Sequence, residues 1–269
     1  MTKINYPEIT LKNGREASLL RGHPWVFSGA IAGMKGQPSD GDIVLAKDSR
    51  GQPLALGFFN GRTDISFRVL TRDCNQAVDA AFWNERVQAA LELRRRLVNA
   101  KTNAYRLMNA EGDGCPGLIV DVYDDTQVIS VTTAGMEKQK QNILDALIAH
   151  LKPARIYEQS AGRSRGLEGL QDSRGFIYGD DQRGAVRIME NGYSFDVDFI
   201  GGQKTGFFLD QRGSREKLGA LSRDRTVLNC FCYTGAFSVY AAAGGAKKVF
   251  SLDISKSACA AASEHLRLN

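Results

Sequence analysis

The stretch Val227-Leu228-Asn229-Cys230-Phe231-Cys232-Tyr233-Thr234-Gly235-Ala236-Phe237, followed by Leu252-Asp253, decides the fold class. An apolar run leads into a short loop with one glycine, a helix-like segment follows, and a second apolar run ends in a carboxylate. In nucleotide-binding α/β proteins such a loop brings backbone N–H groups close to the ligand, and the carboxylate accepts ribose hydroxyls. Asp253 follows Gly235 at close to the expected spacing of about 20 residues. An ordinary strand, turn and helix with a surface aspartate is the alternative.

The loop also narrows the class of ligand. Only Gly235 remains of the G-x-G-x-x-G pattern with which dinucleotide-binding proteins approach a pyrophosphate. An NAD-linked oxidoreductase is therefore the weaker alternative. A ligand with a ribose but no phosphate, such as S-adenosylmethionine, fits the loop better.

Elements around this stretch extend the α/β pattern. We predict strands over 226–230 and 248–253 and helices over 236–243 and 256–268, which open a parallel, doubly wound sheet. Upstream, two alternating runs at 186–190 and 193–199 flank Asn191-Gly192, a strong hairpin signal. A helix is expected over 212–220.

The preceding residues differ in pattern. Residues 8–72 contain short strand-like runs at 43–46, 54–59 and 65–70, separated by turn signals, which predicts a small barrel or sandwich. A middle α+β module is expected from a helix over 78–98, a hairpin at 117–123 and 128–131, a helix over 137–151 and a strand over 155–158. Residues 160–190 show no clear period. The predicted domains are therefore residues 1–74, 75–184 and 185–269.

Composition excludes several classes of protein. The chain has 269 residues, is 43% hydrophobic, has five scattered cysteines and carries a formal net charge of +5. No apolar run reaches the ~18 residues of a membrane span, and the N-terminus lacks the apolar core of a signal peptide. We expect a cytoplasmic protein without disulfides. The basic excess lies in both ends of the chain, which fits a polyanionic partner such as nucleic acid.

Here the sequence resembles a known family. The run from Gly202 to Arg212, together with Asn229–Phe237 and Leu252-Asp253-Ile254-Ser255, resembles the ribosomal RNA large subunit methyltransferase I proteins. These class I methyltransferases make 5-methylcytosine in 23S rRNA. Residues 12–72, with Arg21-Gly22-His23-Pro24-Trp25-Val26-Phe27, look like the PUA domain of that family, a small RNA-binding barrel.

The resemblance implies roles for particular residues. It implies S-adenosylmethionine as cofactor and 23S rRNA as partner, with Asp253 on the ribose. The other implied cofactor residues are Gln203, Lys204, Thr205, Asp210, Gln211, Arg212, Asn229, Phe231, Tyr233, Thr234 and Gly235. Asp253 itself is expected to be an unpaired, solvated carboxylate in the free protein.

RNA binding is expected on the N-terminal module, where basic residues surround an aromatic one. The predicted residues are Lys12, Arg15, Arg21, His23 and Trp25. His23 has a second interpretation, in which it only braces the turn before Trp25.

One departure from the family concerns catalysis. Strands beyond the second helix, the family's Asp-Pro-Pro motif and its catalytic cysteine are absent from these 269 residues. The chain therefore looks truncated at its C-terminus, and we expect it to contain no catalytic residue and to be inactive alone. The open sheet is expected to self-associate, forming a homodimer, or to be poorly ordered. A non-catalytic RNA-binding protein with a clipped or decayed cofactor domain is the alternative.

Cys230 and Cys232 are the one cysteine pair with close spacing. They fit a nucleophile or a metal pair less well than two small apolar residues at a strand end, because no further Cys or His partner is suitably spaced. We therefore expect no metal site.

Overall fold

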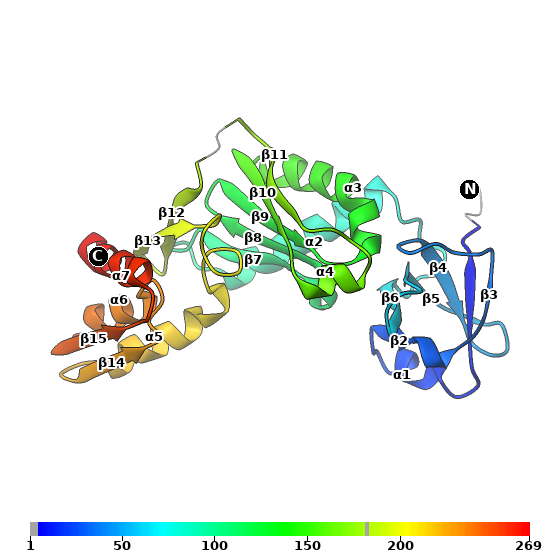
Figure 1. Cartoon of the computed structure of the whole chain (residues 1–269), viewed down its shortest axis with the longest axis horizontal. Helices are drawn as coiled ribbons and strands as arrows, with labels where there is room; N and C mark the ends of the chain where they lie inside the picture. Colours follow the sequence, from blue (N-terminus) through cyan, green and yellow to red (C-terminus); the bar gives the residue numbers. More distant parts are fainter. Residues whose placement is uncertain (1–4, 181–182) are drawn as a thin grey trace. The chain divides into compact units, whose positions relative to one another are not determined.

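The computed structural model describes residues 5–180 and 183–269. Residues 1–4 of the predicted N-terminal domain, and residues 181–182 of the predicted irregular segment, lie outside the described residues. Among those described, a mixed α/β architecture is present, and Figure 1 labels most of its helices and strands.

The N-terminal part forms one six-stranded sheet with the order β2-β6-β5-β4-β1-β3. Its elements are β1 (Glu8–Leu11), α1 (Glu16–Leu20), β2 (Trp25–Phe27), η1 (Ser28–Ala30), β3 (Ile31–Lys35), β4 (Ile43–Lys47), β5 (Pro53–Phe59) and β6 (Ile65–Thr71). Alternating residues of β4, Val44 and Ala46, enter a buried cluster with Ile9, Val26 and Phe67. Strands from across the sheet thus share one core, and the predicted small β domain is confirmed.

A five-stranded sheet follows, with the order β11-β10-β9-β8-β7. The elements of this region are α2 (Ala80–Leu97), β7 (Ala104–Asn109), η2 (Ala110–Asp113), β8 (Leu118–Tyr123), β9 (Thr126–Val131), α3 (Ala134–Leu151), β10 (Arg155–Ser160), α4 (Arg163–Leu167) and β11 (Ser173–Tyr178). The prediction missed β7, α4 and β11. Helix α4 has only five residues and β11 lies at the sheet edge with little alternation of burial, so neither produces a clear period.

The last region begins with the hairpin of β12 (Ala185–Glu190) and β13 (Tyr193–Asp198), which are antiparallel. Both turn residues, Asn191 and Gly192, have positive φ, so the predicted Asn-Gly hairpin is confirmed. The remaining elements are η3 (Leu209–Gln211), α5 (Arg212–Leu221), β14 (Thr226–Cys230), α6 (Ala236–Ala243), β15 (Lys248–Leu252) and α7 (Lys256–Leu268). Strands β14 and β15 are parallel, as the predicted β-α-β-α series requires (Figure 1).

Strands β14 and β15 are apolar but not covered. Leu228 is 63% exposed, Phe250 46% and Leu252 61%, whereas strands of a doubly wound sheet are covered on both faces by helices. These two strands carry the predicted cofactor loop at their carboxyl ends.

The described residues group into two compact units. Within the described residues, one unit comprises residues 5–94, Leu107–Val120 and Ile129–Gly179. The second comprises Arg95–Arg106, Asp121–Val128 and residues 180 and 183–269. Strands β7, β8 and β9 contribute residues to both. The three domains expected from the sequence therefore stay a prediction.

Candidate functional site

The loop after β14 turns sharply into helix α6. Phe231 and Tyr233 have φ values of 59° and 47°, in the left-handed region that non-glycine residues rarely adopt. Gly235 has φ 76°, and a Cβ there would lie 2.5 Å from the Cβ of Ala262 on α7. A glycine is therefore required at this position, because the loop passes directly against α7 before α6 begins.

Asp253, at the end of β15, faces this loop. One carboxylate oxygen accepts the backbone N–H of Tyr233 at 2.9 Å, and the other accepts the N–H of Ser255 at 2.9 Å. These backbone hydrogen bonds, from Ser255 and then Tyr233, lower the pKa of Asp253, so the group is ionised at neutral pH. The expectation of an unpaired carboxylate was wrong: the tight loop points the N–H of Tyr233 directly at it.

Tyr233 joins the loop to the segment Gln203–Gly206. Its hydroxyl donates to the carbonyl of Gly206 at 3.1 Å and accepts the N–H of Gln203 at 3.0 Å. Its ring packs edge-to-face on Phe208, with centroids 5.4 Å apart. Burial raises the pKa of Tyr233, which keeps the phenol protonated and able to donate. The structure thus brings together two stretches about 30 positions apart in the sequence.

Gly206 itself allows this close contact. It has φ 116°, and a Cβ there would lie 2.7 Å from the side chain of Val197 on β13. Lys204, also with positive φ, is exposed, and its ammonium lies 4.6 Å from the ring centroid of Phe208. The segment therefore follows a fixed path over the loop.

Thr205 points away from the loop. It is buried, and its hydroxyl donates to the carboxylate of Asp121 on β8 at 2.6 Å. The side chain of Thr205, a predicted cofactor residue, therefore anchors the segment to β8.

The remaining predicted cofactor residues divide by exposure. Asp210 is exposed, and Gln211 and Arg212 are half-buried around the start of α5. Asn229 donates to the hydroxyl of Ser238 at 2.9 Å, which ties β14 to α6. Phe231 is 91% exposed, and Thr234 contributes its carbonyl to a contact with His265.

None of the thiols with a shifted pKa is activated as a nucleophile. Burial raises the pKa of Cys232 to about 11 and that of Cys115 to about 12, and it also raises the pKa of Cys74. A nucleophilic thiol needs the opposite shift. The described residues contain no group of three or more metal-binding side chains.

Sequence reasoning missed four buried polar residues of this region. Arg215 on α5 forms a two-pronged ion pair with Glu190, with N–O distances of 2.8 and 2.7 Å, and both side chains are buried. Asp121 and His265 are also buried. The sequence around a charged residue in a helix or strand does not show whether its side chain is buried. Only the partners that surround it in the folded structure show this.

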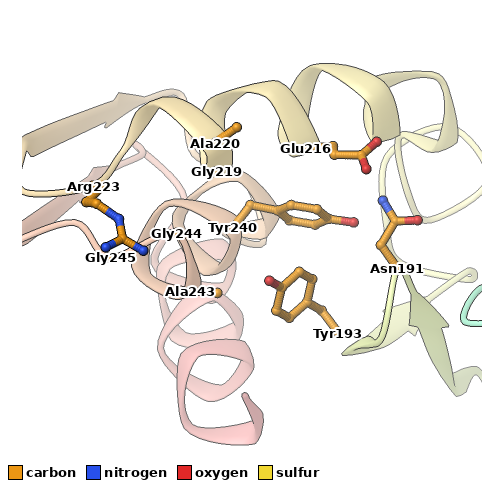
Figure 2. A pocket seen from close by; sticks show the side chains of 10 residues that line it. All are labelled: Asn191, Tyr193, Glu216, Gly219, Ala220, Arg223, Tyr240, Ala243, Gly244 and Gly245. Carbon is orange, nitrogen blue, oxygen red and sulfur yellow. The ribbon is translucent and has the colours of Figure 1, made fainter.

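A cavity of about 450 Å³ lies elsewhere in the same unit (Figure 2). It is lined by the turn of the β12–β13 hairpin, helix α5 and the C-terminal end of α6. The rings of Tyr193 and Tyr240 pack edge-to-face in its wall, with their centroids 4.6 Å apart. The lining includes Ala243, the last residue of α6, whereas Gly235 precedes the first residue of that helix. This cavity is therefore distinct from the predicted cofactor loop.

The predicted RNA-binding residues lie on the N-terminal β domain. Arg15, His23 and Trp25 line a cavity of about 390 Å³ together with the half-exposed Phe27. Arg21 is exposed, and Lys12 donates to the carbonyl of Gly29 at 2.8 Å.

Two of these residues also have structural partners. The N–H of Trp25 donates to His23 Nδ1 at 3.2 Å, and the indole N–H donates to Glu111 at 2.8 Å. His23 therefore does brace the turn, while its ring remains exposed beside the cavity.

Two protein-family models match this chain. A PUA-like domain model matches residues 9–72, and an S-adenosylmethionine-dependent methyltransferase model matches residues 105–269. Ribosomal RNA large subunit methyltransferase I of Pseudoalteromonas translucida is 41% identical over 262 residues, which are 97% of this chain and 66% of that protein. The Klebsiella pneumoniae protein of the same name is 39% identical over 270 residues, 100% of this chain and 68% of that protein. The chain thus spans about two thirds of the length of these relatives.

Solved structures agree in fold. A protein described as an S-adenosylmethionine-dependent methyltransferase from Streptococcus mutans superposes with a TM-score of 0.82 at 26% identity, covering 97% of this chain and 67% of its own. A structure described as a methyltransferase complexed with SAH (S-adenosylhomocysteine) gives a TM-score of 0.83 at 25% identity, covering 97% and 66%. No helix among the described residues is long and apolar enough to cross a membrane.

Proposed function

The chain belongs to the S-adenosylmethionine-dependent methyltransferases of the ribosomal RNA large subunit methyltransferase I family, and from this membership we propose that it functions in the methylation of 23S rRNA, at C5 of cytosine. The observation that carries the proposal is the Asp253 carboxylate held against the strained loop of Phe231–Gly235 at the carboxyl ends of β14 and β15. Ligands of parallel α/β sheets bind at that edge.

The residues present fit S-adenosylmethionine. Asp253 is ionised and half-exposed, and each of its oxygens has a lone pair left after accepting one backbone N–H. These are acceptors for the two ribose hydroxyls. Gly235 allows the loop to pack directly against Ala262 of α7, which fixes the loop beside Asp253. When bound, the cofactor would supply an electrophilic methyl group.

A role for Gln203–Arg212 at the methionine end of the cofactor is part of the same proposal. Tyr233 holds this segment beside the loop, and the guanidinium of Arg212 has no ion pair within the described residues. A guanidinium is suited to bind a carboxylate with two parallel hydrogen bonds.

The N-terminal domain is proposed to bind the RNA. The cavity beside His23, Trp25 and Phe27 has aromatic walls, and Arg15 supplies an exposed cation at its rim. Unstacked bases bind to aromatic side chains, and phosphates bind to exposed guanidinium groups.

Two measurements test the proposal. Calorimetric titration of the chain with S-adenosylhomocysteine should show binding at one site, and no heat at millimolar ligand would contradict the cofactor assignment. In a radiolabelled methyl-transfer assay on 23S rRNA we expect no turnover by this chain, because the Asp-Pro-Pro motif and the catalytic cysteine that the family resemblance implies are not among these residues. Turnover would show that the nucleophile is among these residues.

A further inference from the structure

We infer that Asp121, on β8 and more than 80 positions before the predicted cofactor segment, is a positioning residue of the cofactor site that acts through Thr205. The inference rests on the proposed function of the segment Gln203–Gly206. It adds a residue that neither the loop motif nor the family resemblance marks as part of the site.

Asp121 is a fully buried carboxylate with three defined donors. Arg106 Nε and one terminal nitrogen donate to its two oxygens at 2.8 and 2.9 Å, and the hydroxyl of Thr205 donates at 2.6 Å. The hydrogen bonds to Asp121 raise the pKa of Arg106. A buried charge is tolerated only when it is paired and hydrogen-bonded, so this geometry is strongly constrained.

Tyr123, two residues further along β8, completes the anchor. Its hydroxyl lies 3.0 Å from that of Thr205 and 3.4 Å from the carbonyl of Phe207. Because the Thr205 hydroxyl donates its one hydrogen to Asp121, Tyr123 is the donor in their contact. Burial raises the pKa of Tyr123, which keeps its hydroxyl protonated.

The segment is thus held from two sides. Asp121 and Tyr123 hold the Thr205 side chain on one side, and the phenol of Tyr233 holds the backbone of Gln203 and Gly206 on the other. A binding segment that is ordered before the ligand arrives does not lose that conformational freedom on binding. Removing the Thr205 hydroxyl should therefore weaken cofactor binding even though that hydroxyl points away from the loop.

The test compares variants at Thr205 with S-adenosylhomocysteine as the probe. Thr205→Val removes the hydroxyl at nearly constant volume, and we expect its Kd by calorimetry to rise about tenfold. Thr205→Ser keeps the hydroxyl and should restore the Kd to within about twofold of the wild type. Thr205→Ala removes the same group with less risk of overpacking and serves if the valine variant does not fold.

Trypsin cleavage after Lys204 supplies a second readout on the same proteins. Lys204 is exposed between the two anchors, so cleavage there should be faster in Thr205→Val and Thr205→Ala and unchanged in Thr205→Ser. If the wild type does not bind the probe, the proposed function fails. If the wild type binds and the folded valine or alanine variant matches it in both Kd and cleavage rate, the role of Asp121 is overturned.

Discussion

His265 Nδ1 lies 2.7 Å from the carbonyl oxygen of Thr234, a residue of the predicted cofactor loop. On its other side, Nε2 accepts the backbone N–H of Asp196 at 3.0 Å. A carbonyl can only accept, so Nδ1 is the donor to Thr234. Because Nε2 also lies 3.2 Å from the carbonyl oxygen of Asp196, the imidazole joins the loop to β13. His265 is buried on α7, and no sequence pattern indicated its role.

Replacing His265 should loosen the loop. His265→Leu leaves the carbonyl of Thr234 and the N–H of Asp196 without their partner, at a cost of about 1–3 kcal/mol for each buried group. We expect a lower midpoint of thermal unfolding and weaker binding of S-adenosylhomocysteine. His150→Leu, which removes a histidine from the end of α3, is the matched control and should change neither. Equal probe affinity in His265→Leu and the wild type would contradict a role at the loop.

Asp253→Ala should weaken S-adenosylhomocysteine binding by about a hundredfold or more. Two charge-assisted hydrogen bonds to the ribose are lost, and the N–H of Tyr233 loses its acceptor. Calorimetry measures the effect, with Asp224→Ala as a control at an exposed aspartate before β14. Unchanged affinity would remove Asp253 from the site.

The same carboxylate gives a defined pH dependence of stability. Because the folded protein lowers the pKa of Asp253 below its ordinary value of 3.8, its contribution is fully present above that pH. It is lost as the pH falls through the folded pKa. The difference in unfolding midpoint between wild type and Asp253→Asn should therefore be constant from pH 7 to about pH 5 and shrink below pH 3.8. A difference that grows on acidification would have the wrong sign.

Breaking the ion pair of Glu190 and Arg215 should strongly destabilise the folded protein. Arg215→Met leaves a fully buried carboxylate without its guanidinium, so we expect a loss of about 3–5 kcal/mol in the free energy of unfolding. Denaturant titration measures it. Arg267→Met breaks the exposed pair with Glu264 and should change stability little. A small effect at Arg215 would mean that Tyr240, which also donates to Glu190, suffices to satisfy that carboxylate.

RNA binding should depend on Arg15 and Arg21. Charge reversal of both to Glu should weaken binding of an rRNA fragment and reduce the slope of log K against log salt by about 0.7 for each lost phosphate contact. Arg50→Glu reverses an exposed charge at another turn of the same domain and is the matched control. If all three reversals weaken binding equally, only net charge matters. If none does, the basic segment is a solvated face.

The exposed face of β14 and β15 should drive self-association. Leu228, Phe250 and Leu252 are all at least 46% exposed on adjacent parallel strands, and contiguous apolar surface of this kind favours association. Sedimentation of the chain should show a dimer or larger species that the variant Phe250→Lys with Leu252→Lys converts to monomer. Leu20→Lys, at an exposed leucine of α1, should have no effect. A wild-type monomer at high concentration would contradict the proposed homodimer.

Much of the fold could be predicted from the sequence, because the apolar runs and turn residues that define a strand or helix lie within a few positions of one another. The bounds of β14, α6 and α7 match the prediction to the residue, since each follows an unbroken apolar or helical run with clear turn residues at its ends. The Asn191-Gly192 hairpin was correct because both residues must adopt positive φ there. The helix predicted over 78–98 is α2, whose last buried residue is Leu91, so that Leu97 at its end is 67% exposed.

The sequence by itself determined the β-α-β-α series and the positions of Gly235 and Asp253, because strand, turn and helix preferences act over a few residues. Only the tertiary structure decided the partners of the buried polar groups. Asp253 pairs with the loop, Thr205 turns away to Asp121, and His265 holds Thr234. Those partners lie 20 to more than 80 positions apart, and a buried carboxylate has the same sequence neighbours as a solvated one. Its energy depends on which donors the fold brings within about 3 Å, and that is a property of the assembled structure.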